Sequence, residues 1–307
     1  MPAYVTHSLF GKDIYEAIDE SKLKQILSDY KIAYEWGLQG PDLLFFYGML
    51  PPRRNHNLNR LGGVMHRIKA DELFNTLTQY LSACKNHACY QNTFAYIMGF
   101  CCHYALDSIA HPYIYYRQQE LKRILPKAEH RGIHHKVESD IDSEIYLVKT
   151  GKMINHFNIM KDLISDKKMQ QDIAKLYEYV FLNVYDIKID NTAIQKCFGD
   201  AYRIIRLVMG KPLALCFAKI LDGLALKRNS LSAHVRRKKG DGDPLNLNKK
   251  PWYHLTNNSA RTNITFLQLE QQSLVKALSM QNTIYKAVQD GILNPFAGLD
   301  SFDNGSL

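Results

Sequence analysis

Apolar residues recur at intervals of three and four positions along most of this chain, which is the spacing of amphipathic helices. Strand-like alternation of apolar and polar residues is scarce, and residues 181–189 form the one ambiguous run. The pattern predicts helices over 13–34, 70–84, 92–110, 113–125, 134–148, 155–165, 169–182, 191–199, 211–227 and 262–290. We therefore expect an all-α fold, built as a helix bundle.

One of these apolar stretches, residues 99–112, carries a stripe of polar side chains. His103, Asp107 and His111 stand at i, i+4 and i+8, and successive members of such a series are offset by only about 40° around a helix. Two imidazoles and a carboxylate among apolar residues need polar partners, and a metal ion can satisfy all three. Spacing alone leaves open the alternative of a buried His–Asp pair beside an unrelated His.

Imidazole and carboxylate groups also stand on other segments of the chain. His134 and Glu138 form a second i, i+4 pair, with His135 as the alternative to His134. Nitrogen and oxygen donors without cysteine are typical of zinc sites that keep an open position for catalysis. The candidate metal ligands are His7, Asp42, His66, His103, Asp107, His111, His134 and Glu138.

Composition describes a folded protein of ordinary polarity. The chain has 307 residues, of which 46% are hydrophobic and 22% charged, enough apolar material for a substantial core. No run of 18 apolar residues predicts a transmembrane helix, and the first residues do not resemble a secretory signal. The six cysteines show no disulfide-framework spacing, so we expect reduced thiols and a cytoplasmic location.

The net charge of +9 is concentrated in one stretch, residues 227–239, with a smaller basic group at Arg53 and Arg54. This stretch is either a solvated connection between helices or a basic lip that attracts an anionic phosphodiester or a membrane surface. The aromatic–basic alternation of single-strand binding grooves is missing, so no stable nucleic-acid partner is expected. The predicted organisation is a catalytic helical domain (1–226), a basic loop (227–261) and a helical extension (262–307) that packs back on the domain.

Three motifs resemble the zinc-dependent phospholipase C family in their order along about residues 1–150. They are His103-Tyr104-x-x-Asp107, His111-Pro112 and His134-x-Lys136-Val137-Glu138. That family includes secreted bacterial enzymes that cleave phosphatidylcholine and is structurally related to single-strand-specific zinc nucleases. The resemblance implies a helix bundle with its metal site in the core.

The resemblance also implies ligands for two or three zinc ions. Those of the first ion would be Asp42, His66, His103 and Asp107. Those of the second would be His111, His134 and Glu138. A third would be held by His7, with Asp107 as a bridging carboxylate. By hypothesis, removal of the initiator Met1 exposes the Pro2 amine, which would take the place of the amino-terminal Trp of the secreted enzymes. The gap from Asp107 to His111 is shorter than in those enzymes.

The function that this ligand set predicts is zinc-dependent hydrolysis of a phosphoric ester, in which metal-activated water attacks a phosphodiester. Asp42 would act as general base if it is not fully committed to metal. A phospholipid or similar molecule is the favoured substrate, with peripheral membrane contact through residues 227–239. The alternatives are a phosphodiesterase or nuclease acting on nucleotides or single-stranded nucleic acid, and a non-catalytic protein stabilised by metal.

Overall fold

The computed structural model describes residues 4–48, 58–125, 130–158, 164–208, 240–256 and 261–304. Within these ranges the secondary structure is helical, and the only strand-like pairing is one bridge between Trp252 and Thr262. The all-α prediction is confirmed. The helices are α1 (Tyr4–Ala17), α2 (Ser21–Asp29), α3 (Lys31–Gly37), α4 (Leu58–Arg67), α5 (Ala70–Ala83), α6 (Tyr90–Ile124), α7 (His130–Thr150), α8 (Lys167–Tyr185), α9 (Asn191–Val208) and α11 (Phe266–Asp290), with 3-10 turns η1 (Gly40–Phe46) and η2 (Ile154–His156).

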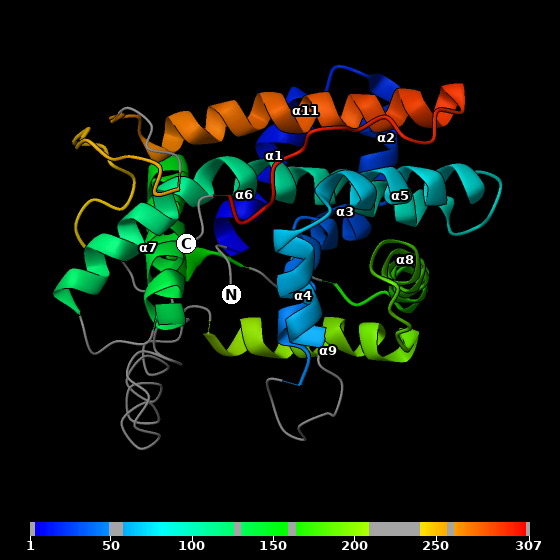
Figure 1. Cartoon of the computed structure of the whole chain (residues 1–307), viewed down its shortest axis with the longest axis horizontal. Coiled ribbons are helices and arrows are strands. Elements are labelled where there is room, and N and C mark those ends of the chain that lie inside the picture. Colours follow the sequence, from blue (N-terminus) through cyan, green and yellow to red (C-terminus); the bar gives the residue numbers. More distant parts are fainter. Residues whose placement is uncertain are drawn as a thin grey trace.

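Helix α6, of 35 residues, forms the centre of the bundle. Almost every residue from Thr93 to Ile114 is buried, as expected for a helix that is apolar on all sides. It runs alongside α11 through the molecule and also contacts α1, α3, α7 and α8 (Figure 1). The polar stripe predicted on this segment therefore lies in the core of the bundle.

The prediction of two helices, over 92–110 and 113–125, is wrong because α6 continues through Pro112. A proline inside a helix has no N–H for the carbonyl four residues earlier, which here is that of Ser108. Asn304 supplies the missing donor, since its Nδ2 lies 3.3 Å from the Ser108 carbonyl oxygen. A tertiary contact thus replaces the hydrogen bond that the proline removes.

Two glycines let α3 cross α6 at very short range. A Cβ atom added at Gly37 would lie 2.1 Å from the carbonyl oxygen of Tyr96, and one added at Gly99 would lie 2.3 Å from that of Tyr34. Only glycine fits such a backbone-to-backbone contact. Because η1 follows α3 directly, this crossing brings η1 close to the middle of α6.

Several other predicted segments differ from the structure. The predicted helix 13–34 is three helices, α1, α2 and α3, with Glu20 capping α2 through a 3.2 Å bond from the Lys22 N–H. The described part of the predicted helix 155–165 holds only the short η2, and the ambiguous run 181–189 begins as the end of α8 and continues as chain without regular secondary structure. The predicted helix 211–227 lies outside the described residues.

Beyond α11, the chain returns along α5 toward α6 as an irregular segment, residues 292–304 (Figure 1). The Asp71 carboxylate on α5 accepts hydrogen bonds from the backbone N–H groups of Gly298 and Leu299, at 2.8 and 2.7 Å. Asn75 exchanges two further bonds with the backbone of Phe296. The division into 1–226, 227–261 and 262–307 stays a prediction, because 209–239 lies outside the described residues.

Candidate metal centre

The eight candidate ligands come from five elements that meet at one side of α6. His103, Asp107 and His111 lie on α6 itself, and all three are buried. The other five are supplied by the neighbouring elements: His7 by α1, Asp42 by η1, His66 by α4, and His134 and Glu138 by α7. Side chains that project inward from facing helices are the usual way in which a bundle builds a metal site.

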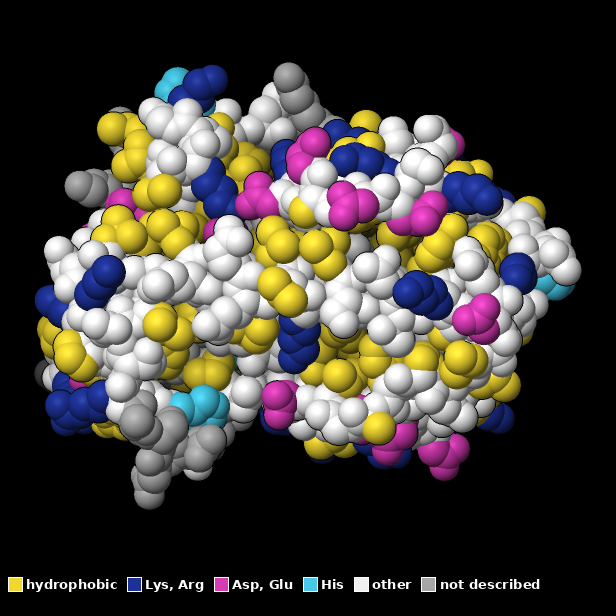
Figure 2. Space-filling view, turned by 90° about the horizontal axis from the view of Figure 1, so that it is seen from above, with side chains coloured by type: hydrophobic (Ala, Val, Ile, Leu, Met, Phe, Trp, Pro, Cys, Tyr) yellow, Lys and Arg dark blue, Asp and Glu magenta, His cyan; other side chains and the backbone are white. Residues whose placement is uncertain are grey.

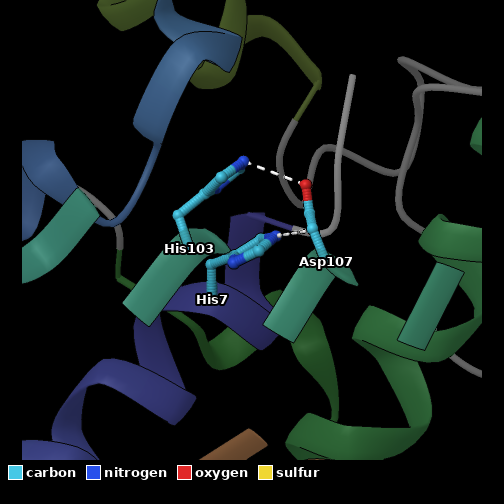
Figure 3. Close-up of side chains that lie close together, drawn as sticks. All are labelled: His7, His103 and Asp107. Atoms are coloured by element: carbon cyan, nitrogen blue, oxygen red, sulfur yellow. Dashed lines mark ion pairs between the residues drawn. The ribbon is translucent and has the colours of Figure 1, made fainter. Parts of the chain in front are cut away.

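Asp107 lies between two imidazoles from different helices (Figure 3). Its Oδ1 is 3.2 Å from Nε2 of His7, and its Oδ2 is 3.0 Å from Nε2 of His103. The two rings stack on each other with centroids 4.3 Å apart. Each carboxylate oxygen therefore faces a different nitrogen, which is the arrangement that a bridging carboxylate needs.

Asp42 and His66 complete a second grouping on the other side of His103. Oδ1 of Asp42 is 3.1 Å from Nε2 of His66, and its Oδ2 is 3.7 Å from Nε2 of His103. Nε2 of His66 is also 3.9 Å from Oδ2 of Asp107. The four residues that the resemblance assigns to one zinc are thus brought together, with His103 shared between the two groupings.

His111, His134 and Glu138 form the third grouping, with ligand atoms within 4.8 Å of one another. Nε2 of His134 lies 3.1 Å from Oε1 of Glu138, and the rings of His111 and His134 stack at 5.7 Å. The short gap after Asp107 is therefore compatible with a place for His111 beside the α7 pair. His135 contacts Oε2 of Glu138 at 3.3 Å but belongs to none of the three groupings.

Four of these imidazoles direct Nδ1 at a carbonyl oxygen. The acceptors are Gly62 for His66 (2.7 Å), Leu38 for His103 (3.1 Å), Phe302 for His111 (2.7 Å) and the Gln118 side chain for His134 (3.0 Å). A carbonyl can only accept, so Nδ1 must carry the proton, and in the neutral ring the lone pair is on Nε2. Metal-binding histidines are typically oriented in this way.

The electrostatics of the site show carboxylates held ionised by imidazoles. Burial raises the pKa of Asp107, but the charges of His103 and His111 outweigh it and hold that pKa well below its usual range. Burial lowers the pKa of His66, yet the hydrogen bond and charge of Asp42 raise it overall to about 9. Protons thus provide the positive charge that these carboxylates require.

Two buried polar atoms in the site, Nδ1 of His7 and Oδ2 of Asp42, have no hydrogen-bond partner, and Nε2 of His103 faces only carboxylate oxygens, at 3.0 Å from Asp107 and 3.7 Å from Asp42. Such atoms are costly unless something pairs with them. A cation held between the oxygen of Asp42 and the nitrogen of His103 would satisfy both. The donor set, its burial and these unpaired atoms all fit zinc.

Comparison with known families agrees with this geometry. The model of the family described as zinc dependent phospholipase C matches residues 6–198, well over half of the chain and a range that contains all eight candidate ligands. The chain belongs to the zinc-dependent phospholipase C family. The predicted family is thereby confirmed, over a longer stretch than the motifs covered. No curated protein and no solved structure matches the chain significantly.

Sequence reasoning missed the groups that orient the ligands of this zinc-dependent phospholipase C family member. Gln118 could have been found, because it stands seven residues after His111 and so shares its face of α6. The carbonyls of Gly62, Leu38 and Phe302 could not, since every residue has one.

Three predicted features of the family member lie outside the described residues: the basic stretch 227–239, the Arg53–Arg54 pair and the Pro2 amine. On the face that contains α11, basic and acidic side chains are interspersed (Figure 2). Among the described helices, none combines the length and the apolar character needed to span a bilayer.

Proposed function

We propose that this chain is a zinc-dependent phosphoric ester hydrolase of the phospholipase C type, which acts on a phosphodiester such as a phospholipid. The observation that carries the proposal is the position of Asp107, whose two oxygens face imidazoles from α1 and α6 while His103 also faces Asp42. Closely spaced metal ions require ligands that they can share, such as a carboxylate with one oxygen directed at each ion. Family membership supports the same class of reaction.

In this proposal the three groupings hold two or three zinc ions with the ligands given above. Asp42, His66, His103 and Asp107 bind one ion, and His111, His134 and Glu138 bind another. His7 and Asp107 provide a third position. The Pro2 amine, which lies outside the described residues, remains its proposed further ligand. Blocking that amine with an amino-terminal tag tests this assignment, because zinc content should fall from three per chain toward two, and unchanged content would contradict it.

Zinc bound in such a site lowers the pKa of a water molecule toward neutrality and neutralises the oxygens of a phosphoryl group. The residues of the chain hold the site ready for this chemistry. The hydrogen bonds from Nδ1 of His66 and His103 to backbone carbonyls direct Nε2 of each ring toward the metal site. Because the ligands are buried, few solvent molecules can compete with substrate for the site. Asp42 is proposed mainly as a ligand, and it would serve as general base only if one of its oxygens is not taken by the metal.

Zinc analysis combined with a substrate panel tests this function. Purified protein is assayed for zinc per chain, for phosphocholine release from phosphatidylcholine vesicles and for nucleotide release from single-stranded DNA. We expect at least two zinc ions per chain and phosphocholine release, and His103→Ala should bind fewer zinc ions and release no phosphocholine. His87→Ala, a substitution of an exposed histidine between α5 and α6, is the matched control and should behave as wild type.

The other outcomes separate the alternatives. Nucleotide release without phosphocholine release would identify a nuclease or phosphodiesterase of the same metal chemistry. Zinc binding with no hydrolysis across a broad ester panel, together with unfolding of His103→Ala, would identify a protein that uses metal for stability alone. Membrane contact through residues 227–239 is tested by vesicle sedimentation of a variant whose basic residues in that stretch are neutralised.

A further inference from the structure

The segment 292–304 ends inside the metal centre. The Phe302 side chain is fully buried, and its ring centroid lies 5.3 Å from that of His66 and 6.1 Å from that of His103. Its backbone carbonyl accepts the 2.7 Å hydrogen bond from Nδ1 of His111. One residue therefore contacts imidazoles that belong to all three ligand groupings, since His103 is shared between two of them.

The next two residues attach to the elements that carry those imidazoles. The backbone N–H of Asp303 donates to the carbonyl of His66 at 3.1 Å, near the end of α4. Asn304 donates to the Ser108 carbonyl that Pro112 leaves without a helical donor. These contacts connect α4 to α6 at the level of the ligands.

The segment is also held in place before it reaches the site. The Tyr104 hydroxyl donates to the carbonyl of Asp300 at 2.8 Å, and Asp71 and Asn75 bind the chain farther back. The ring of Phe302 packs against Tyr104 at 4.7 Å and against Phe100 at 5.9 Å. The position of its carbonyl is thus defined by several independent contacts on α5 and α6.

We propose that Phe302 is a positioning residue of the zinc centre: its carbonyl keeps Nε2 of His111 directed toward His134 and Glu138, and its ring keeps His66 and His103 in place. The inference rests on the proposed zinc site. The contacts of Asp107 with His103 and of Asp42 with His66 do not involve the segment 292–304. The hydrogen bond from His111 to the Phe302 carbonyl therefore serves chiefly the grouping of His111, His134 and Glu138. Loss of a hydrogen-bonding partner behind a metal-binding histidine typically weakens metal affinity by about 10- to 100-fold.

Three variants test the proposal, one shortened chain and two single substitutions in the full chain. A chain ending at Asp300 removes the carbonyl and the ring together. Phe302→Leu keeps the carbonyl and an apolar side chain but loses the ring. Phe296→Leu is the matched control, because Phe296 lies on the same segment and packs on Phe74 at 5.6 Å without contacting a candidate ligand.

Zinc affinity is measured by competition with a chelator, and folding by far-UV circular dichroism, so that the readout does not depend on activity. For the chain ending at Asp300 we expect one zinc per chain to bind about 10- to 100-fold more weakly, and for Phe302→Leu a smaller loss. Phe296→Leu should retain the wild-type affinity. If the shortened chain fails to fold, Phe302→Leu compared with Phe296→Leu decides the outcome.

The results also separate this inference from the proposed function. Wild-type protein that binds zinc without hydrolysing any ester would contradict the function and leave the positioning role to be decided by the variants. Unchanged zinc affinity in both Phe302→Leu and the chain ending at Asp300 would overturn the positioning role while the function stands. Unchanged affinity with faster hydrolysis would also overturn it and would identify the segment as a cover over the site. Wild-type protein without zinc would overturn both.

Discussion

At the scale of single residues, Asp107 is the side chain on which most of the site depends. It is buried on α6, and its two oxygens contact imidazoles from α1 and α6 at 3.2 and 3.0 Å. A neutral amide of the same shape offers one acceptor oxygen and no charge, so it cannot bridge two cations. Loss of the Asp107 carboxylate is therefore expected to reduce zinc binding more than loss of a ligand that belongs to a single grouping.

Asp107→Asn should lower zinc content by at least one ion per chain. The expected fall in affinity exceeds the roughly 100-fold that loss of an outer partner costs, because a direct ligand is removed. Elemental analysis after dialysis measures the effect. Asp172→Asn is the control, since Asp172 is an equally buried carboxylate on α8 that pairs with Asn92 and Lys168. Equal zinc content in the two variants would contradict the bridging role.

His66 links zinc binding to pH. In the zinc-free chain its pKa is raised from 6.5 to about 9, so the proton on His66 stabilises the fold fully below 6.5, and this contribution is lost as the pH rises through about 9. Zinc must displace that proton. Between these values, zinc uptake should release protons and zinc affinity should rise with pH. Calorimetry in buffers of different ionisation enthalpy measures the release, and heat that is independent of the buffer would contradict it.

At the scale of elements, the crossing of α3 and α6 sets the distance between Asp42 and His103. Gly37 and Gly99 allow the two backbones to meet, and η1 follows immediately with Asp42 in its first turn. Gly40, which begins η1, has a φ of +49°, and a Cβ there would lie 2.5 Å from the ring of His103. Small residues at these positions therefore serve the site as well as the packing.

Gly99→Ala should destabilise the protein by about 1–3 kcal/mol, the usual cost of overpacking. The added Cβ would lie 2.3 Å from the carbonyl oxygen of Tyr34, which is backbone and cannot turn away. Urea unfolding measures the loss. Gly199→Ala on α9 is the control, because nothing lies within 4 Å of its Cβ position and alanine favours a helix by about 0.5–1 kcal/mol. Equal stability of both variants would contradict the close crossing.

At the scale of the whole molecule, the metal centre joins parts of the chain that are distant in sequence. Its candidate ligands come from α1, η1, α4, α6 and α7, and the segment 292–304 closes on them. A ligand that binds only the folded state stabilises it in proportion to the logarithm of its concentration over Kd. Zinc is therefore expected to hold the bundle together as well as to support catalysis.

Removal of zinc with a chelator should lower Tm by several degrees for each ion removed, since each site at about 1,000 times its Kd contributes about 4 kcal/mol. Differential scanning calorimetry of the same sample with and without zinc measures the change. His87→Ala should keep this zinc-dependent shift, whereas His103→Ala should lose most of it. An identical Tm with and without zinc would show that the metal does not stabilise the fold.

Much of the fold could be predicted because helical periodicity is a local property. The segments 70–84, 169–182 and 262–290 correspond closely to α5, α8 and α11. Errors occurred where distant contacts override local rules. Pro112 predicted a break in α6, but the donor that replaces its missing N–H comes from Asn304, 196 positions along the chain from the Ser108 carbonyl that it binds.

The sequence by itself determined the family and the polar stripe of α6, because residues four apart on one helix share a face whatever surrounds them. It also indicated which side chains could bind zinc, because nitrogen and oxygen donors suit that metal. Only the tertiary structure decided which donors meet and what orients them. The carbonyl of Phe302 shows the reason: backbone groups are identical at every residue, so their role depends on where the fold places them.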